Sequence, residues 1–396
     1  MTKITDIPAI RFKGFSDTWE QRKVTEIGKI YIGLVTTMTK HYTDEGTLLI
    51  RNSDIKDGKF EFGDNPIYLE KTFAEKNETR MHQIGDVITV HTGDVGTSAV
   101  ITENEAKSIG FATIVTRPNP KIIDSNYLCS FLNTDKHKKW AVSISTGDGR
   151  TNYNLGDYFE LVVPVPSIAE QKKIASYIQK LNRLITLHQR KYDKLTNVKK
   201  SMLEKMFPQN GSNAPEIRFK GFTEAWEQRK VREVTDRYDN LRIPVAASLR
   251  VAGTTPYYGA NGIQDYVDGY THDGEFILVA EDGANDLKNY PVKCVKGRIW
   301  VNNHAHVLQG KYDCADNQFL AYAISQADIE SLLVGGGRAK LNAETLMGID
   351  LLLPNKAEQI RIGKYLAQLD NLITLHQREL EKLKNLKKAC LEKMFV

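Results

Sequence analysis

Residues 181–207 read LNRLITLHQRKYDKLTNVKKSMLEKMF, and residues 369–395 repeat the stretch as LDNLITLHQRELEKLKNLKKACLEKMF. Of the 27 positions, 18 are identical, at an offset of 188. In both copies apolar residues recur at steps of three and four, which predicts a helix with one apolar stripe, narrow enough for a coiled-coil seam. The same steps place Leu386 on the stripe of the second copy. Four equivalent positions of each copy are our candidates for subunit interfaces on these helices: Leu181, Ile185, His188 and Leu195, and Leu369, Ile373, His376 and Leu383.

A second repeat opens each half of the chain. IRFKGFSDTWEQRKV at residues 10–24 returns as IRFKGFTEAWEQRKV at residues 217–231, with 12 of 15 positions identical. Residues 25–160 and 232–350, between the repeated ends, do not resemble each other. The sequence therefore predicts two tandem units, each with a shared start, a private middle and a shared end.

The long helices have start and stop signals. Pro166-Ser167 and Pro354-Asn355 precede them, and the run Pro-Gln-Asn-Gly-Ser-Asn-Ala-Pro after Phe207 is typical of a linker. Each helix would span about 40 residues, or about 60 Å. A helix of that length needs a partner, so we expect the two to pack together, antiparallel if the units are related by a pseudo-twofold. The alternative is two separate amphipathic helices, each on its own core.

The segments between the repeated ends, residues 25–160 and 232–350, are predicted to form α+β domains. Short β-rich runs alternate with Gly, Asn and Asp turns, and one helical interval follows in each half, at 125–143 and 317–333. The predicted strands are 47–51, 86–90, 112–116, 160–165, 275–280, 298–301 and 350–353. We divide the chain into domain 1–165, helix and linker 166–210, domain 211–353 and helix 354–396.

Composition narrows the class of protein. The 396 residues are 41% hydrophobic with a formal net charge of +5, which is ordinary for a soluble globular chain. No run approaches the 18 apolar residues of a membrane span, and four cysteines without a Cys-x-x-Cys fit a reducing compartment. We therefore expect a cytoplasmic protein with no membrane partner.

Catalytic and metal motifs are weak in this sequence. The segment Gly335–Lys340 lacks the spacing of a phosphate loop, and Asn65-Pro66-Ile67-Tyr68 departs by one residue from the Asn-Pro-Pro-Tyr motif of amino-methyltransferases. His304 and His306, with Cys294 and Cys314 about ten residues away on either side, match no usual zinc spacing. We predict a chain with no catalytic residues and no metal site.

Polar and amide residues gather instead in turn-rich stretches of both middles. Arg suits guanine, Asn suits adenine, and Ser, Thr, Tyr and Lys suit phosphates. The alternative for each residue is an ordinary polar loop. The candidate DNA-binding residues are Arg51, Asn52, Ser53, Lys56, His91, Thr92, Arg150, Asn152, Tyr153, Asn154, Tyr257, Tyr258, Asn261, Asn302, Asn303, His304, Arg338, Lys340 and Asn342.

These features together resemble the specificity subunit of type I restriction–modification systems. The resemblance rests on the paired starts Trp-Glu-Gln-Arg-Lys-Val, the dissimilar middles, and the junctions Pro166–Gln171 and Pro354–Gln359, each followed by a long helix ending Glu-Lys-Met-Phe. It extends over essentially the whole chain. The segments Tyr153–Asp157 and Lys340–Asn342 also look like those that close each target-recognition domain of the family.

The resemblance implies a fold and a function. Two target-recognition domains in a pseudo-twofold arrangement would each read one half of a bipartite site in double-stranded DNA. The helices would fix the gap and dock two methyltransferase subunits, with nuclease/translocase subunits joining the full complex. S-adenosylmethionine, ATP and Mg²⁺ would bind those partners, so we expect no cofactor on this chain. Two alternatives are a self-contained adenine methyltransferase and an orphan, modification-only specificity subunit; a third is a coiled-coil adaptor without a DNA role.

The positive charge lies on the predicted helices. Residues 167–206 carry a net +7 and residues 355–396 a net +4, whereas residues 1–166 carry −2 and 207–354 carry −4. Phosphate attraction grows with the number of phosphates neutralised, so the two middles alone should bind DNA weakly. The basic helix faces could meet acidic partner surfaces or the DNA of the gap; they hold Lys172, Lys173, Lys199, Lys200, Lys387 and Lys388.

Overall fold

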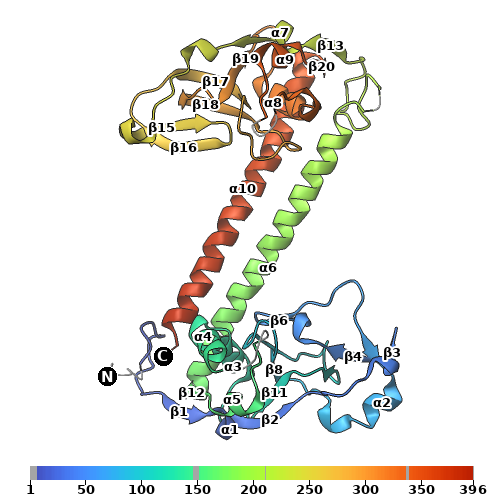
Figure 1. The fold of residues 1–396 in the computed structure, drawn as a ribbon, viewed down its shortest axis with the longest axis vertical. Helices are drawn as coiled ribbons and strands as arrows, with labels where there is room; N and C mark the ends of the chain where they lie inside the picture. The colour runs from blue at the N-terminus through green and yellow to red at the C-terminus, as the bar shows by residue number, and fades with distance from the viewer. Residues whose placement is uncertain (1–6, 146–150, 210, 336–338, 396) are drawn as a thin grey trace. The chain divides into compact units, whose positions relative to one another are not determined.

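The chain folds into two compact units. The computed structural model describes residues 7–145, 151–209, 211–335 and 339–395. Unit 1 comprises residues 1–189 with 378–396, and unit 2 comprises residues 190–377. Both boundaries, after Gln189 and after Gln377, fall at the same position of the 188-residue repeat. Each unit therefore contains part of both long helices (Figure 1).

Unit 1 is built on an antiparallel sheet of strand order β2-β11-β8-β9, with helix α3 packed on β8 and β9. Unit 1 also contains a smaller mixed sheet of strand order β10-β4-β7-β3 and the hairpin β5–β6. The elements are β1 (Glu20–Lys23), α1 (Val24–Ile27), β2 (Gly28–Ile32), β3 (Tyr42–Thr43), β4 (Thr47–Ile50), β5 (Ile55–Lys56), β6 (Lys59–Phe60), β7 (Tyr68–Leu69), α2 (Lys71–Glu75), β8 (Val87–Thr89), β9 (Ser98–Val100), β10 (Ile109–Gly110), β11 (Ile114–Pro118), α3 (Ser125–Leu132), α4 (Asp135–Ile144), α5 (Leu155–Phe159), β12 (Val162–Val165) and α6 (Ile168–Lys205).

Unit 2 carries a six-stranded sheet of order β14-β19-β17-β18-β15-β16, in which only β15 and β18 pair in parallel. Helix α8 packs on β17 and β18, as α3 packs on β8 and β9 in unit 1. The elements are β13 (Glu227–Lys230), α7 (Val231–Val234), β14 (Thr235–Arg237), β15 (Ala252–Gly259), β16 (Gly262–Val267), β17 (His272–Ala280), β18 (Val292–Val301), β19 (Ala305–Gly310), α8 (Asn317–Ser325), α9 (Ala343–Gly348), β20 (Asp350–Leu353) and α10 (Lys356–Lys393).

The repeated Trp-Glu-Gln-Arg-Lys segment forms the same strand pair in both units. In unit 1, β1 pairs antiparallel with β12, from Glu20 opposite Val165 to Lys23 opposite Val162. In unit 2, β13 pairs with β20 in the equivalent register. Because β12 and β20 lead directly into the long helices, this pair ties the start of each unit to the start of one helix.

A buried glutamine fixes the first turn of each long helix. The Gln171 side chain accepts from the Asp124 backbone N–H at 2.7 Å and donates to the carbonyls of Ile122 and Pro166. Gln359 makes the same three bonds, accepting from Asp316 N–H and donating to the carbonyls of Cys314 and Pro354. Since Asp124 and Asp316 are the N-caps of α3 and α8, one amide connects two helix starts in each unit.

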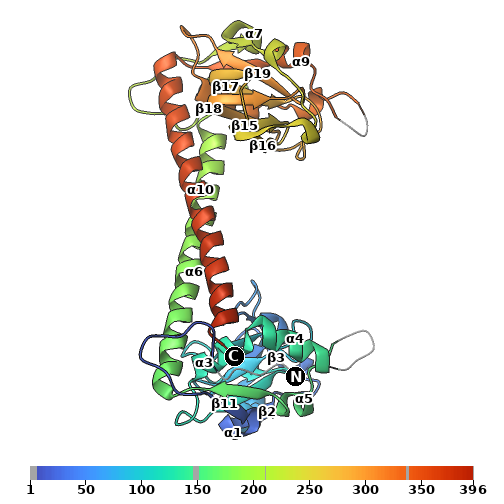
Figure 2. The same cartoon turned by 90° about the vertical axis from the view of Figure 1, so that its left-hand side faces the viewer.

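Within each unit the two long helices run antiparallel, and each is 38 residues long (Figure 2). In unit 1 the first half of α6 and the last turns of α10 join the core: Leu181, Cys390 and Phe395 are buried there, and Leu383 packs against it. In unit 2 Leu195 and Met202 pack against the core that contains Leu366 and Leu369. The two helices therefore pack together, rather than on separate cores. Within the described ranges, no helix has the length and apolarity needed to cross a membrane.

The predicted α+β fold class, with two domains and two long helices, is confirmed, but three details were wrong. The predicted helix 125–143 is two helices, because the Thr134 hydroxyl accepts from His137 N–H and caps a new start at α4. Helix α8 ends at Ser325, and only a short 3₁₀ turn (Glu330–Leu332) follows within the predicted interval. Leu386 is 42% exposed and lies off the stripe, which passes through Leu383 and Cys390. The four-part division of the chain stays a prediction.

Candidate nucleic-acid interface

In unit 1 a group of predicted residues meets at the ends of β4 and β8. Asn52 follows β4, and its amide oxygen accepts from His91 N–H at 2.8 Å. Its amide nitrogen donates to the Ala112 carbonyl at 3.2 Å. Since His91 and Thr92 follow β8, one asparagine side chain holds together the loops that leave two different sheets.

The segment that precedes α5 closes this edge. Asn152 forms an isolated β-bridge with Thr92, and the Thr92 hydroxyl donates to the Asn152 amide oxygen at 3.0 Å. The next residue, Tyr153, donates its backbone N–H to the His91 carbonyl at 2.9 Å. The polar side chains of His91, Thr92 and Asn152 are thus held on one surface and are partly exposed.

Unit 2 builds the same arrangement from different residues. Asp282 follows β17 and forms a β-bridge with Lys340, and Leu341 donates its N–H to the Glu281 carbonyl at 2.7 Å. Asn342 then stands at the N-cap of α9, as Asn154 does for α5. The closing segments therefore occupy equivalent places, although Asn152-Tyr153 in one unit corresponds to Lys340-Leu341 in the other.

Ion pairs organise the unit 2 edge. His304 Nδ1 lies 2.5 Å from an oxygen of Asp282, and Lys340 Nζ lies 2.9 Å from Glu281. Glu281 also accepts from Arg242 at 2.7 Å. Burial alone would raise the pKa of Glu281, but the hydrogen bonds from Arg242 and Lys340 outweigh it and hold that pKa below its usual value. The edge therefore presents fixed charges of both signs.

The turn between β15 and β16 adds amide groups to this edge. Asn261 accepts from Asn285 N–H at 2.8 Å and donates to the Gly283 carbonyl at 2.9 Å. In a second turn, between β18 and β19, Asn302 accepts from His304 N–H at 2.8 Å, and Asn303 is exposed beside it. Asparagine can thus serve both to shape the loops and to present an amide to a ligand.

Four predicted DNA contacts need correction, because their side chains are buried. Tyr153 packs beneath the unit 1 edge against His137, Trp140 and Tyr158. Tyr258 lies in a core of unit 2, and Tyr257 is buried beneath Arg250 with its hydroxyl bonded to the Val245 backbone. Asn302 is buried behind the turn that it stabilises. These side chains support the loops rather than forming their surface.

The other candidates divide by exposure. Arg51 is half-buried and bonds Asp54 through two nitrogens, so its guanidinium is held within its own turn. Arg150 and Arg338 lie outside the described residues. The exposed candidates are Ser53, Lys56, Asn154, Asn261, Asn303, Lys340 and Asn342, and the half-buried ones are Arg51, Asn52, His91, Thr92, Asn152 and His304.

The sequence analysis missed Glu281 and Asp282. The signal was present, because Glu281-Asp282-Gly283 follows a buried strand in unit 2 just as His91-Thr92-Gly93 does in unit 1. No group of three or more His, Cys, Asp or Glu side chains in the described part of the chain is arranged to hold a metal ion. What the exposed Asn, Lys, Thr and His groups offer is hydrogen bonding to base edges and phosphates.

Comparison with known proteins identifies the family. Residues 16–197 and residues 223–385 each match the model of the type I restriction modification DNA specificity domain. The chain belongs to the type I restriction–modification specificity family. Two copies of the specificity domain thus cover both repeats found in the sequence, and the resemblance stated from those repeats is confirmed.

Relatives in the specificity family agree with this assignment. A Haemophilus influenzae protein named as a type I restriction enzyme specificity subunit is 44% identical over 146 residues, which is 37% of this chain and 38% of that protein. The MjaVIII specificity subunit of Methanocaldococcus jannaschii is 24% identical over 300 residues, or 68% of each protein. The crystal structure of the type I restriction-modification system S subunit from M. genitalium shares the fold, with a TM-score of 0.68, 14% identity and coverage of 98% of this chain and 99% of that chain.

The eight helix positions predicted to form subunit interfaces differ in burial, and their role in an interface stays a prediction. Leu181 and Leu369 are buried, each in the core of its own unit. The remaining six are half-buried along α6 and α10: Ile185, His188, Leu195, Ile373, His376 and Leu383. Docking of other subunits of a type I system on these helices remains a proposal.

Proposed function

We propose that this chain is the non-catalytic DNA-specificity subunit of a type I restriction–modification complex. Each unit reads one half of a bipartite site in double-stranded DNA, and the long helices set the gap and dock two methyltransferase subunits. The same subunit serves methylation and restriction. S-adenosylmethionine, ATP and Mg²⁺ belong to the methyltransferase and nuclease/translocase subunits.

One observation carries the proposal. Both units build the same edge, with a strand-end loop bridged to a closing segment, but they place different side chains on it. Unit 1 presents Thr92 and Asn152, whereas unit 2 presents Asp282, His304 and Lys340. Two unlike surfaces on matched scaffolds suit an asymmetric two-part sequence, which a symmetric homodimer cannot read.

The test is the methylation pattern of a strain that carries the whole complex. We expect a two-part methylated motif with the native chain. Asn152→Ala should relax one half of the motif, and Lys340→Ala should relax only the other half. Methyl transfer by the purified chain alone would instead support a self-contained methyltransferase, and an unchanged motif in both variants would contradict reading by these edges.

The role of the helices needs a separate experiment. A seven-residue insertion after Gln189 and another after Gln377 would lengthen both helices by about 10.5 Å, close to three base-pair steps of about 3.4 Å. We expect the gap of the motif to grow by about three base pairs while both halves stay the same. Altered halves with an unchanged gap would contradict the idea that the helices set the spacing.

A further inference from the structure

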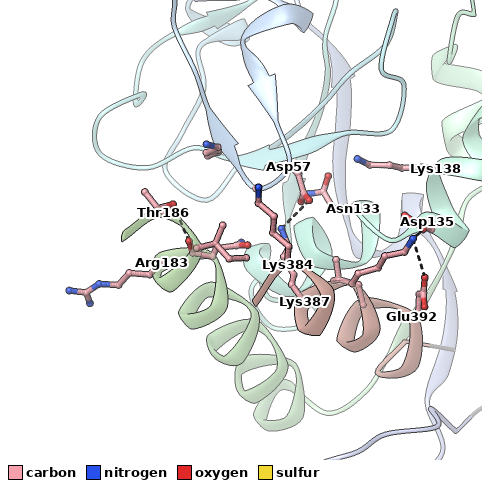
Figure 3. Close-up of a pocket in the computed structure, with 15 residues that line it drawn as sticks. Asp57, Asn133, Asp135, Lys138, Arg183, Thr186, Lys384, Lys387 and Glu392 are labelled. Atoms are coloured by element: carbon pink, nitrogen blue, oxygen red, sulfur yellow. Dashed lines mark hydrogen bonds and ion pairs between the residues drawn. The ribbon is translucent and has the colours of Figure 1, made fainter. Parts of the chain in front are cut away.

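Each unit contains a basic cleft between its domain and its helix pair. In unit 1 the cleft has a volume of about 550 Å³ and lies between the β5–β6 hairpin, α4 and the two long helices (Figure 3). Its lining holds six basic and three acidic side chains. The surplus of positive charge stands out, because residues 1–166 as a whole are slightly acidic.

The unit 2 cleft uses the same positions of the helix repeat. It has a volume of about 970 Å³ and lies between α8, the β17–β18 connection and the helix pair. Lys199, Lys200 and Thr374 line it, and they correspond at the 188-residue offset to Lys387, Lys388 and Thr186 in unit 1. The repeat therefore duplicates a cleft as well as a helix.

The first lysine of each pair is held by a carboxylate. Lys387 bonds Asp57 at 2.9 Å, and Lys199 bonds Asp370 at 2.5 Å while lying over the Tyr322 ring. The unit 1 pair joins α10 to the β5–β6 hairpin, whereas the unit 2 pair joins the two long helices. They leave the neighbouring lysines, Lys388 and Lys200, at the exposed rim.

Several lysines at the rims of the clefts make no ion pair with the described residues. In unit 1 these include Lys138 on α4 and Lys384 on α10, which Figure 3 shows on either side of Asp57. In unit 2 they include Lys200 on α6 and Lys288 in the β17–β18 connection. Each cleft thus has uncompensated ammonium groups on its domain side and on its helix side.

We propose that these two clefts bind phosphates of the DNA backbone beside each half-site; this inference rests on the proposed function. Ammonium groups on a rim suit phosphate oxygens, and a duplex presents the same group on both flanks of a two-part site. The described unit 1 lining contains no aromatic ring. The unit 2 lining contains Tyr290 and Tyr322, but both are buried, and Lys199 lies over the Tyr322 ring. This favours the backbone over a free nucleotide. The clefts supply the phosphate attraction that the acidic domains lack.

The test compares the salt dependence of DNA binding by the assembled complex. One variant carries Lys138→Gln with Lys384→Gln, and the second carries Lys200→Gln with Lys288→Gln. The control carries Lys180→Gln with Lys364→Gln, two exposed helix lysines outside both clefts. The Kd is measured over a series of salt concentrations, for a duplex with the methylated motif and for one without it.

We expect either cleft variant to weaken both duplexes by a similar factor, roughly tenfold, and to lower the slope of log K against log salt by about 1 to 2. The motif itself should not change. A slope and affinity equal to those of the control would overturn the proposal, and so would loss of the partner subunits on purification, which would make the clefts docking sites for an acidic protein segment. If the native complex shows no preference for the motif, the proposed function fails, while the slopes still decide the role of the clefts.

Discussion

Arg11 reaches both oxygens of the Glu170 carboxylate, at 2.7 and 2.8 Å, and Arg218 repeats the same two bonds to Glu358. The preceding residue of each repeat bonds the end of the other long helix, Ile10 N–H to the Lys393 carbonyl and Ile217 N–H to the Lys205 carbonyl. Each Ile-Arg-Phe-Lys-Gly-Phe segment therefore joins the first turn of one helix to the last turn of the other. These contacts explain the structural role of the repeat at residues 10–24 and 217–231.

The Arg11–Glu170 pair should be costly to break on one side only. Glu170 is 1% exposed and Arg11 11%, so Arg11→Met leaves a buried carboxylate and should destabilise unit 1 by roughly 3 kcal/mol. Adding Glu170→Met should recover most of that loss. Urea unfolding of the native chain, the two single variants and the double variant gives the coupling free energy between Arg11 and Glu170. Arg22→Met, which breaks an exposed pair with Glu20, is the control and should change stability by less than about 1 kcal/mol. Equal losses in the single and double variants would contradict the coupling.

Replacing either helix-start glutamine should loosen its own unit alone. Gln171→Leu leaves the Asp124 N–H and two carbonyls without their partner, a loss of roughly 2–4 kcal/mol. Hydrogen exchange should quicken in the first turns of α3 and α6. Gln359→Leu should do the same for α8 and α10, whereas the exposed Gln368→Leu should leave exchange unchanged. Exchange that rises equally in both units after one substitution would rule out a local role.

Unit 1 should lose stability in mild acid. Burial lowers the pKa of His82 and of His137 from 6.5 to about 4. The unfolded chain binds a proton at each histidine near pH 6.5, whereas the folded chain does so only near pH 4. The free energy of unfolding is therefore highest above pH 6.5 and falls as the pH drops towards 4. The loss is at most about 3 kcal/mol per histidine.

Thermal unfolding at pH 7 and pH 5 checks this expectation. His137→Gln, which keeps a polar group near the Leu132 carbonyl, should remove part of the pH dependence. Proton NMR gives an independent reading, because both imidazoles should remain neutral in the folded chain at pH 5. Titration of both rings near pH 6.5 in the folded chain would contradict the assignment.

Each reading edge should be adjustable without the other. Thr92→Val removes the bond to Asn152 and should relax the half-site read by unit 1. Asp282→Asn removes the charge that pairs with His304 and should relax the half read by unit 2. Methylation motifs of the two variants check this, with Thr102→Val, which acts on an exposed turn elsewhere in unit 1, as the control. A variant that alters both halves would show that the edges are coupled.

The repeats were sufficient to predict the two long helices, their starts and the tandem units, because helical periodicity and Pro-containing starts are local signals. The pairing of β1 with β12 and of β13 with β20 was not predicted. The sheets of the middles were predicted only in part. Strands β15, β16 and β19 depend on pairing between distant segments, so their residues carry weak local signals. Burial was the harder problem: Tyr153, Tyr257 and Tyr258 looked like surface aromatics in turn-rich stretches, but all three are buried. Tyr258, for example, belongs to a core with Phe276 and Val307, which the pairing of strands brings together. The clefts could not be predicted either, because their lysines come from elements that are far apart in the sequence.

The composition of unit 1 determines when it can finish folding. Its core includes Cys390, Leu391, Met394 and Phe395, with the Phe395 ring against Tyr127 and Phe131. Those residues leave the ribosome after all of unit 2, which is contiguous from 190 to 377. The domain that is synthesised first is therefore completed last, and until then Tyr127 and Phe131 lack their cover. Translation that stops before residue 378 would leave a finished unit 2 joined to an open unit 1, so both cores are complete only in a product that extends through Phe395.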